Sequence, residues 1–414
     1  MSDSQNIITL SNGIRIIHLQ IKHSEIVHCG FMINAGSRDE NLKNNGVAHF
    51  IEHTVFKGTN ARKSHHILRR IESVGGELNA YTTREKTCYY ASCLKEYAAR
   101  AIDLLSDITF DSVFPEKELE KEKKVILEEI DMYDDSPEES IYDDFYTYIF
   151  KGHPLGYNIL GTKTTVPKLS RQNILDFIKT HYTTDKLVLS IVGDLTVKQA
   201  ESLGKRFVEN ITIPLKDKSV RVVPAINPQF NITKEKDFAQ SHVILGSRAY
   251  SRNDEKRYGL SLINNILGGA GMSARLNMEV REKNALVYNI GTHYSSYQDA
   301  GVFSIYYAAD DKNVQRCQDI IYKELRKMRE IKFSEHQLKS AKIQLLGQMA
   351  QVVENNGVHM QHQARSVLDY GIIYGFKEFM KEIDNVSASE ILEISNDIFA
   401  PENISVLIYQ QEKN

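Results

Sequence analysis

The sequence predicts an α+β protein with two homologous domains, each a mostly antiparallel sheet with helices packed on one face. Two observations predict this fold. The same order of elements occurs twice along the chain, and a polar stretch containing prolines separates the two copies. The length agrees, because 414 residues with 42% hydrophobic side chains provide material for more than one core.

Each copy begins with a strand and a polar turn, continues with a helix, and then forms a strand-rich hairpin. The second copy starts 214 or 215 positions after the first. These elements are expected at residues 27–40, 46–56 and 77–94 in the first copy, and at residues 241–255, 257–267 and 286–309 in the second. Amphipathic helices continue each half.

The boundary between the copies is indicated by a polar stretch with little helical periodicity, which contains three of the eight prolines. We therefore expect an N-terminal domain over residues 1–212, a linker over residues 213–236 and a C-terminal domain over residues 237–414.

Composition limits the classes of partner. The net charge of −3 gives no basis for binding nucleic acid or an anionic membrane surface. The polar N-terminus lacks the features of a secretory signal, and no apolar run is long enough to span a bilayer, so we expect a cytoplasmic protein. Cys29, Cys88, Cys93 and Cys317 match neither a zinc pair nor a disulfide framework, and are expected to be reduced and mostly buried.

The chemistry centres on residues 49–53, His-Phe-Ile-Glu-His. Residues four apart on a helix share a face, so His49 and His53 can bind one cation, and Glu52 can take a proton from the attacking water. The alternative is two histidines on an exposed helix. The corresponding stretch of the second copy, residues 263–268, has no histidine or glutamate, so the fold does not require these side chains.

A third ligand is expected on a helix over residues 116–132. Its apolar positions Leu119, Val125, Ile126 and Met132 predict a buried stripe that contains Glu122 and Glu129. A buried carboxylate is costly unless it is paired or binds a metal, so we predict Glu129 as a zinc ligand and Glu122 as an acid that orients a ligand. For Glu122, a surface ion pair with a neighbouring lysine is the alternative.

These motifs resemble the pitrilysin/insulinase family of zinc metallopeptidases, and most closely its short two-domain members related to mitochondrial processing peptidase. The resemblance covers nearly the whole chain. It includes the inverted zinc motif with Glu129 77 positions after Glu52, and residues 46–53, 56–59, 75–82, 153–156, 268–276 and 280–283.

The resemblance implies further site residues. Family members bind peptides as an added strand on a sheet edge, matched here by Asn79, Ala80, Tyr81 and Thr82. An arginine and a tyrosine seven positions apart also serve their catalytic chamber. They are matched by Arg281 and Tyr288, which could hold the substrate backbone and stabilise the oxyanion. Without the resemblance, Arg281 would pair with Glu279 or Glu282, and Tyr288 would be a buried strand aromatic.

We therefore expect a metalloendopeptidase that binds one Zn²⁺ per chain and cleaves peptides or unfolded segments in a dimer chamber. Because this chain has both the zinc motif and the Arg/Tyr pair, the resemblance favours a homodimer in which Arg281 and Tyr288 act on the partner's zinc site. The alternatives are a catalytically silent scaffold or assembly subunit, and a zinc hydrolase acting on small non-peptide substrates.

Overall fold

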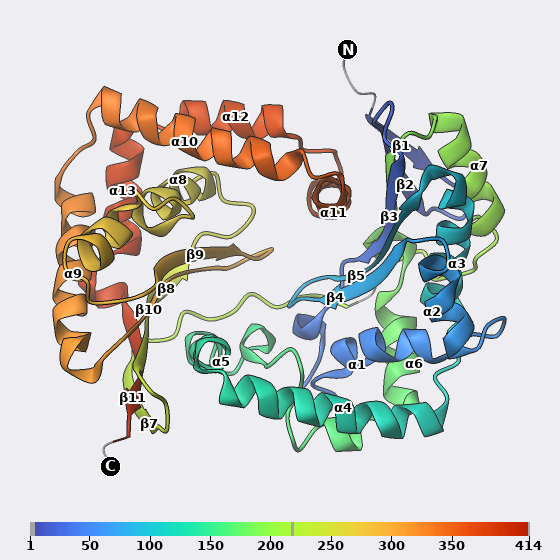
Figure 1. Cartoon of the computed structure of the whole chain (residues 1–414), viewed down its shortest axis with the longest axis horizontal. Coiled ribbons are helices and arrows are strands. Elements are labelled where there is room, and N and C mark those ends of the chain that lie inside the picture. Colours follow the sequence, from blue (N-terminus) through green and yellow to red (C-terminus); the bar gives the residue numbers. More distant parts are fainter. Residues whose placement is uncertain (1–4, 217–218, 413–414) are drawn as a thin grey trace. The chain divides into compact units, whose positions relative to one another are not determined.

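The computed structural model describes residues 5–216 and 219–412, which form two compact units (Figure 1). The described part of unit 1 comprises residues 5–131, 157–216, 219–221 and 351–375. Unit 2 comprises residues 132–156, 222–350 and 376–412. Each unit contains one mostly antiparallel sheet with helices, so the predicted α+β fold class is confirmed. The expectation that helices pack on only one face of each sheet was wrong, because helices contact both faces.

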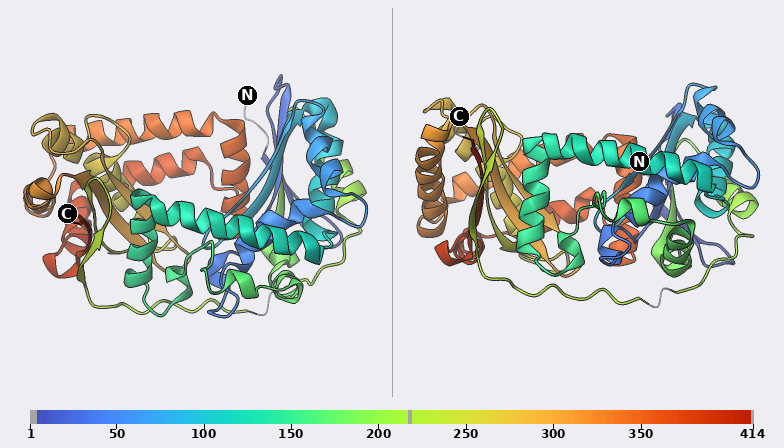
Figure 2. Two further views of the ribbon diagram at one scale, coloured as in Figure 1. Left: turned by 60° about the horizontal axis from the view of Figure 1, so that its bottom comes forward. Right: turned by 90° about the horizontal axis from the view of Figure 1, so that it is seen from below.

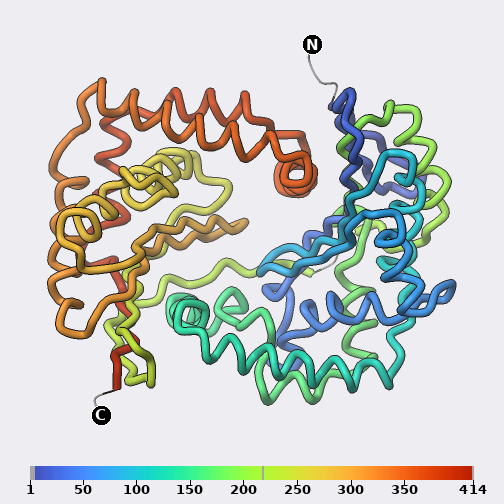
Figure 3. The backbone as a smooth tube through the Cα atoms, in the orientation of Figure 1, coloured from blue at the N-terminus to red at the C-terminus, as the bar shows by residue number. Residues whose placement is uncertain are grey.

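The sheet of unit 1 has the strand order β1-β2-β6-β3-β5-β4. Strands β2 and β6 pair in parallel, and the other neighbouring pairs run antiparallel. The bounds are β1 Gln5–Thr9, β2 Arg15–Gln20, β3 Ile26–Ile33, β4 Glu77–Thr82, β5 Thr87–Leu94 and β6 Leu187–Gly193. The backbone trace shows β4 and β5 as a hairpin, as the sequence predicted, with β4 on the outside of the sheet (Figure 3).

Helices cover both faces of this sheet (Figures 1 and 2). Phe31 of β3 packs on one face against Phe110 of α3, with ring centroids 5.3 Å apart. The next residue, Met32, points to the opposite face and packs with Ala364 and Val367 of α11. The helices of unit 1 are α1 Val47–Thr54, α2 Ser64–Glu72, α3 Ala98–Phe110, most of α4 Glu116–Asp135, α6 Arg171–His181, α7 Val197–Phe207 and α11 Asn356–Tyr370.

The sheet of unit 2 has the order β7-β11-β8-β10-β9, with β7 and β11 parallel and the remaining neighbours antiparallel. Its strands are β7 Asn231–Lys236, β8 Ser241–Ala249, β9 Ile290–Ser296, β10 Gly301–Ala309 and β11 Ser405–Gln411. Its helices are α5 Pro137–Ile149, α8 Arg257–Gly268, α9 Val314–Glu330, most of α10 Glu335–Val353, α12 Phe376–Asn385 and α13 Ala388–Ile398.

Successive side chains of β8 point to opposite faces of the sheet and so belong to two different hydrophobic cores. Leu245 belongs to a core with α8, α9 and α13, whereas Ile244 belongs to a second core with Phe145 of α5. Each sheet therefore carries several helices from its own half of the sequence on one face. On the opposite face it carries one helix from the other half, α11 in unit 1 and α5 in unit 2.

The compact units consequently differ from the two continuous ranges expected from the sequence. Residues 132–156 and 351–375 are exchanged between the halves, because central strands such as β6 are buried along their whole length and need cover on both faces. The end of the expected linker is also structured, since residues 231–236 form strand β7 rather than a free connection.

Two other expectations concern the cysteines and membrane-spanning helices. All four cysteines are free and buried, as predicted. Across residues 5–216 and 219–412, none of the helices has the length and apolar content that crossing a membrane requires.

Candidate metal centre

Helix α1 begins in a backbone conformation that favours glycine. Gly46, the residue before the helix, has φ 95°, and a Cβ atom there would lie 2.8 Å from the carbonyl oxygen of Leu160. The buried carboxylate of Glu40 accepts hydrogen bonds from the backbone N–H groups of Gly46 and Ala48, at 2.8 Å each, and so caps the start of the helix. These contacts fix the helix that carries His49 and His53.

The two histidines lie on one face of α1, with ring centroids 4.6 Å apart. His49 is buried and His53 is partly exposed. Glu129 approaches both from α4. Its Oε2 atom lies 3.8 Å from Nε2 of His49 and 3.4 Å from Nε2 of His53. The structure therefore brings together the three residues predicted as ligands, although His53 and Glu129 lie on two different helices, 76 positions apart in the sequence.

The three side chains fit a zinc ion. Tetrahedral ligands about 2.1 Å from zinc lie about 3.4 Å from one another, close to the two distances to Glu129. One ligand atom from each residue lies within 4.8 Å of the others, and no other such group of histidine, cysteine or acidic side chains occurs in the part of the chain that the structure describes. Two imidazoles and one carboxylate also leave a coordination position for water or substrate.

Glu122 lies on the opposite side of His53. Its Oε2 atom is 3.3 Å from Nδ1 of His53, and its Oε1 atom is 2.6 Å from the ammonium group of Lys57. Because Nδ1 is held by Glu122, Nε2 of His53 is the nitrogen that faces Glu129. Glu122 thus contacts a predicted ligand and also forms the lysine ion pair that was considered as its alternative.

The environment shifts the pKa values of the two histidines in opposite directions. Burial lowers the pKa of His49 to about 4, and the nearby charge of His53 adds to the effect. Burial also acts to lower the pKa of His53, but hydrogen bonds to Glu122 and Glu129 outweigh it and raise the pKa to about 9. His49 is therefore neutral at pH 7 without metal, whereas His53 is protonated.

Glu52, the predicted base, is half-buried next to His53 on α1 and beside Thr82 of β4. Burial raises its pKa, although Thr82 and His53 act in the opposite direction. A carboxylate with a raised pKa is a better proton acceptor near neutral pH.

The buried stripe predicted on α4 was partly wrong. Leu119 and Ile126 are buried as expected, but Val125 and Met132 are 45% and 62% exposed. The buried face continues instead through Ile130. Val125 is one residue from buried Ile126, and Met132 is two residues from buried Ile130. Each step along a helix rotates a side chain by about 100°, so both side chains point away from the buried face. Glu122 is buried and Glu129 half-buried, so the prediction placed both acids on a protected face despite this error.

The predicted peptide-binding residues Asn79, Ala80, Tyr81 and Thr82 all lie in β4, the last strand of its sheet. No strand pairs with the outer edge of β4 anywhere in residues 5–216 and 219–412. Tyr81 packs against Tyr90 at ring centroids 6.1 Å apart, on the face covered by α11. The edge available for pairing thus passes Glu52 at Thr82.

Arg281 and Tyr288 belong to unit 2. Arg281 lies in a π-helical segment, Asn277–Glu282, and Tyr288 lies between that segment and β9. The guanidinium lies 5.8 Å from the centre of the Tyr288 ring, and its Nε atom is 3.7 Å from Glu282. Tyr288 is 86% exposed, so the alternative of a buried strand aromatic was wrong, whereas the Glu282 pair expected as the alternative for Arg281 is present.

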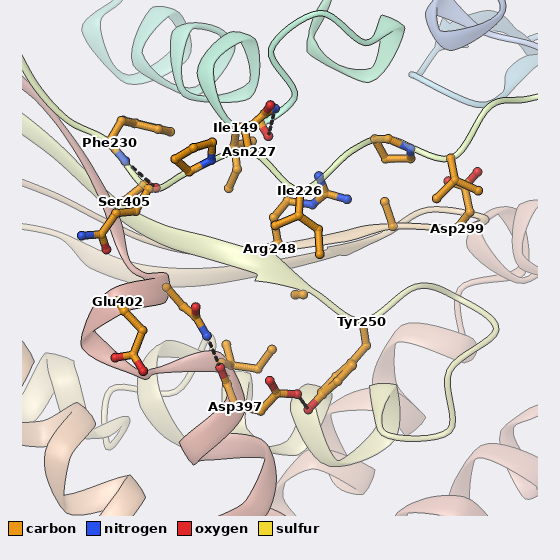
Figure 4. A pocket seen from close by; sticks show the side chains of 18 residues that line it. Ile149, Ile226, Asn227, Phe230, Arg248, Tyr250, Asp299, Asp397, Glu402 and Ser405 are labelled. Carbon is orange, nitrogen blue, oxygen red and sulfur yellow. Dashed lines mark hydrogen bonds between the residues drawn. The ribbon is translucent and has the colours of Figure 1, made fainter.

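A hollow of about 390 Å³ in unit 2 offers no competing metal centre (Figure 4). Its charged lining residues include Arg248, Asp299 and Asp397, but no histidine or cysteine. The hydroxyl of Tyr250 donates to Asp397 at 2.5 Å, so one of its acids already has a partner.

Comparison with known proteins agrees with the motif. The model of the insulinase family, peptidase family M16, matches residues 15–163, and the model described as the peptidase M16 inactive domain matches residues 168–345. The chain is 32% identical over 97% of both chains to a Bacillus subtilis protein named "uncharacterized zinc protease YmxG". It is 34% identical to a Rickettsia felis "uncharacterized zinc protease", over 99% of this chain and 98% of that one.

This chain belongs to the insulinase family, peptidase family M16. Solved structures share the M16 fold. A protease from Helicobacter pylori superimposes with a TM-score of 0.90 at 19% identity, covering 99% of this chain and 100% of the other. A Pseudomonas fluorescens protein described as a peptidase M16 inactive domain also gives a TM-score of 0.90, at 17% identity and 99% coverage of both chains.

Within this M16 chain, sequence reasoning missed two residues that support the candidate centre. Lys57 pairs with Glu122, and Glu40 caps α1. Both occur in the motifs quoted above, Lys57 in residues 56–59 and Glu40 at the end of residues 27–40, so a signal was present without an assigned role.

Proposed function

We propose that this chain is a zinc-dependent endopeptidase with Glu52 as its general base. The observation that carries the proposal is the convergence of His49 and His53 of α1 with Glu129 of α4, whose ligand atoms lie within 4.8 Å of one another. Glu52 lies on the same helix as the two histidines. The M16 relatives named as zinc proteases support the same activity.

Zinc bound there would polarise the peptide carbonyl and lower the pKa of a water molecule. The remaining steps belong to the chain itself. Glu52, whose pKa burial raises, accepts the proton of the attacking water and later delivers it to the leaving amine. Glu122 holds the ring of His53 in one orientation, and Lys57 keeps Glu122 ionised.

We propose that peptides bind along β4 as an added strand. The outer edge of β4, from Asn79 to Thr82, pairs with no other strand of the described residues, and pairing through the main chain tolerates varied side chains. The N–H of Ala80 donates to Oδ1 of Asn79 at 2.8 Å, a contact that a bound peptide could replace. Thr82 lies beside Glu52, so a peptide paired with this edge would run past the base. A zinc hydrolase acting on small molecules would not need such an edge.

We further propose a homodimer in which Arg281 and Tyr288 act on the zinc centre of the partner chain. Tyr288 is 86% exposed, and its hydroxyl has no hydrogen-bond partner in the described residues of its own chain. An exposed phenol next to a guanidinium matches the requirement for donors to a substrate backbone and an oxyanion.

Metal analysis combined with peptide cleavage tests the proposal. Wild-type protein is expected to hold one zinc per chain and to cleave a mixed peptide library until a chelator is added. The Glu129→Gln variant should lose both zinc and cleavage, whereas Glu128→Gln, which alters the exposed neighbour on the same helix, should keep both. Zinc binding without peptide cleavage would favour a silent scaffold, and full activity of Glu129→Gln would refute the ligand set.

A further inference from the structure

Unit 1 contains a hollow of about 510 Å³ whose lining is almost entirely basic. It is formed by residues on α2, just before and just after α2, and at the start of α3, and none of them belongs to the candidate metal centre. The lining residues are Arg62, His66, Arg69, Arg70, Ser73 and Arg100. Four guanidinium groups, one imidazole and one hydroxyl therefore surround a space in the size range of small-molecule sites, roughly 300–1,000 Å³.

The neighbouring acids balance only part of this charge. Arg62 contacts Asp103 and Asp107, each at 2.5 Å, and Arg70 contacts Asp103 at 2.7 Å. Arg100 donates to a backbone carbonyl instead, that of Arg70, at 3.3 Å. Two carboxylates thus face four guanidinium groups, which leaves an excess of two positive charges.

Arg69 contributes a charge that is not neutralised locally. It is exposed on α2, and no ion pair joins it to any acid within residues 5–216 and 219–412. It can therefore turn toward an anion in the hollow without breaking an existing contact.

The arginines are also held close together. Arg62 and Arg70 contact the same oxygen of Asp103, Oδ2, so a single carboxylate atom joins two guanidinium groups. The Nε atom of Arg70 is buried and has no hydrogen-bond partner in the described chain. Two guanidinium groups that share one carboxylate oxygen repel each other, and a buried N–H group without an acceptor costs free energy. An additional anion bound beside Arg62 and Arg70 would reduce both costs.

We propose that this hollow binds a small oligophosphate, such as a pyrophosphate or triphosphate group. Guanidinium forks match phosphate oxygens in geometry, and each phosphate offers several acceptors to arginines approaching from different sides. Two or more phosphate charges balance the excess of the hollow, whereas a single carboxylate balances half of it. The site is independent of the proposed peptidase activity, because it uses none of the residues of that mechanism.

Isothermal titration of inorganic tripolyphosphate into the zinc-loaded full-length protein tests the proposal. Wild type is expected to bind one tripolyphosphate per chain at low ionic strength. The variants Arg69→Ala and Arg100→Gln should each weaken binding by about tenfold, the effect of removing one charge-assisted contact. Arg206→Ala is the matched control, because Arg206 is an exposed arginine of unit 1 on α7 and lies over Phe207, away from this lining.

Wild type and the three variants all keep His49, His53 and Glu129, so any heat from withdrawal of zinc by tripolyphosphate is common to them and cancels in the comparison.

A nucleoside triphosphate serves as a second titrant. Equal affinity assigns recognition to the phosphate chain alone, and tighter binding adds a contact to the nucleoside, both within the proposal. The proposal is overturned if wild type binds no tripolyphosphate at millimolar concentration, if Arg69→Ala and Arg100→Gln bind like Arg206→Ala, or if hexaglutamate binds as tightly.

Discussion

Nδ1 of His53 lies 3.3 Å from Oε2 of Glu122, and this contact joins the two helices that carry the candidate zinc ligands. It gives Glu122 a role in the centre without direct contact to the metal. The carboxylate fixes the ring of His53 so that Nε2, not Nδ1, is presented beside Glu129.

Replacing Glu122 with glutamine is expected to lower zinc affinity by about tenfold, near the lower end of the 10- to 100-fold range for partners of metal ligands, because glutamine keeps the shape but loses the charge. Competition with a chromophoric chelator at about pH 9.5, above the His53 pKa of about 9, measures the affinity without competition from a proton on that ring. Glu120→Gln on the same helix is the control, since Glu120 is exposed and pairs with Lys123 at 2.6 Å. Equal affinities for the two variants would assign Glu122 to a structural ion pair with Lys57 only.

Zinc binding is expected to release about one proton near neutral pH. Without metal, hydrogen bonds to Glu122 and Glu129 raise the pKa of His53 to about 9 against the effect of burial, so zinc must displace its proton. His49, with its pKa lowered to about 4 by burial, is already neutral and releases none. Apparent zinc affinity should therefore rise about tenfold per pH unit from pH 6 toward pH 9 and then level off.

Calorimetry at pH 7.5 in two buffers of different ionisation enthalpy counts the protons directly. The Glu122→Gln variant provides the comparison, because loss of that partner lowers the pKa of His53 and reduces the number of protons released. Release of no proton by wild type would show that His53 is neutral before zinc binds.

Removing the cap of α1 should weaken both the fold of unit 1 and its metal binding. In Glu40→Ala, the N–H groups of Gly46 and Ala48 lose their acceptor, and the side-chain amide of Asn45 keeps only the carbonyl oxygen of Asn158. Each buried donor left without a partner costs about 1–3 kcal/mol, so we expect a total loss of about 3 kcal/mol or more. Thermal unfolding and zinc titration measure the two effects. Glu25→Ala, which removes an exposed acid paired with Lys95, should change neither.

The sequence was sufficient for the parts of the site that depend on local spacing. His49, Glu52 and His53 lie within five residues, and helical geometry alone places the two imidazoles on one face. Glu129 was found because an acid in a protected stripe needs a compensating charge. Even so, the phase of that stripe was misjudged at Val125 and Met132, since both apolar side chains are exposed.

Contacts between distant segments could not be predicted in this way. Lys57 and Glu122 are 65 positions apart, and their pairing depends on how the 3-10 turn Val55–Lys57 meets α4. The same holds for α5 and α11, which cross to the sheet of the other half of the sequence. From the sequence we expected helices on one face of each sheet, whereas β6 is buried along its whole length and both faces of its sheet are covered.

Composite active sites would be revealed by complementation between inactive chains. Glu52→Gln lacks the base and Arg281→Ala lacks the guanidinium beside Tyr288, so each homodimer should be inactive. After mixing and subunit exchange, half of the dimers carry one chain of each kind and have one intact site of two, which predicts roughly a quarter of wild-type activity. Peptide cleavage by the mixture measures it. Mixing Glu52→Gln with a chain carrying both substitutions is the control and should remain inactive, because no chain in that mixture has Glu52. If the first mixture is as inactive as this control while size-exclusion chromatography shows exchanged dimers, Arg281 serves the centre of its own chain or none.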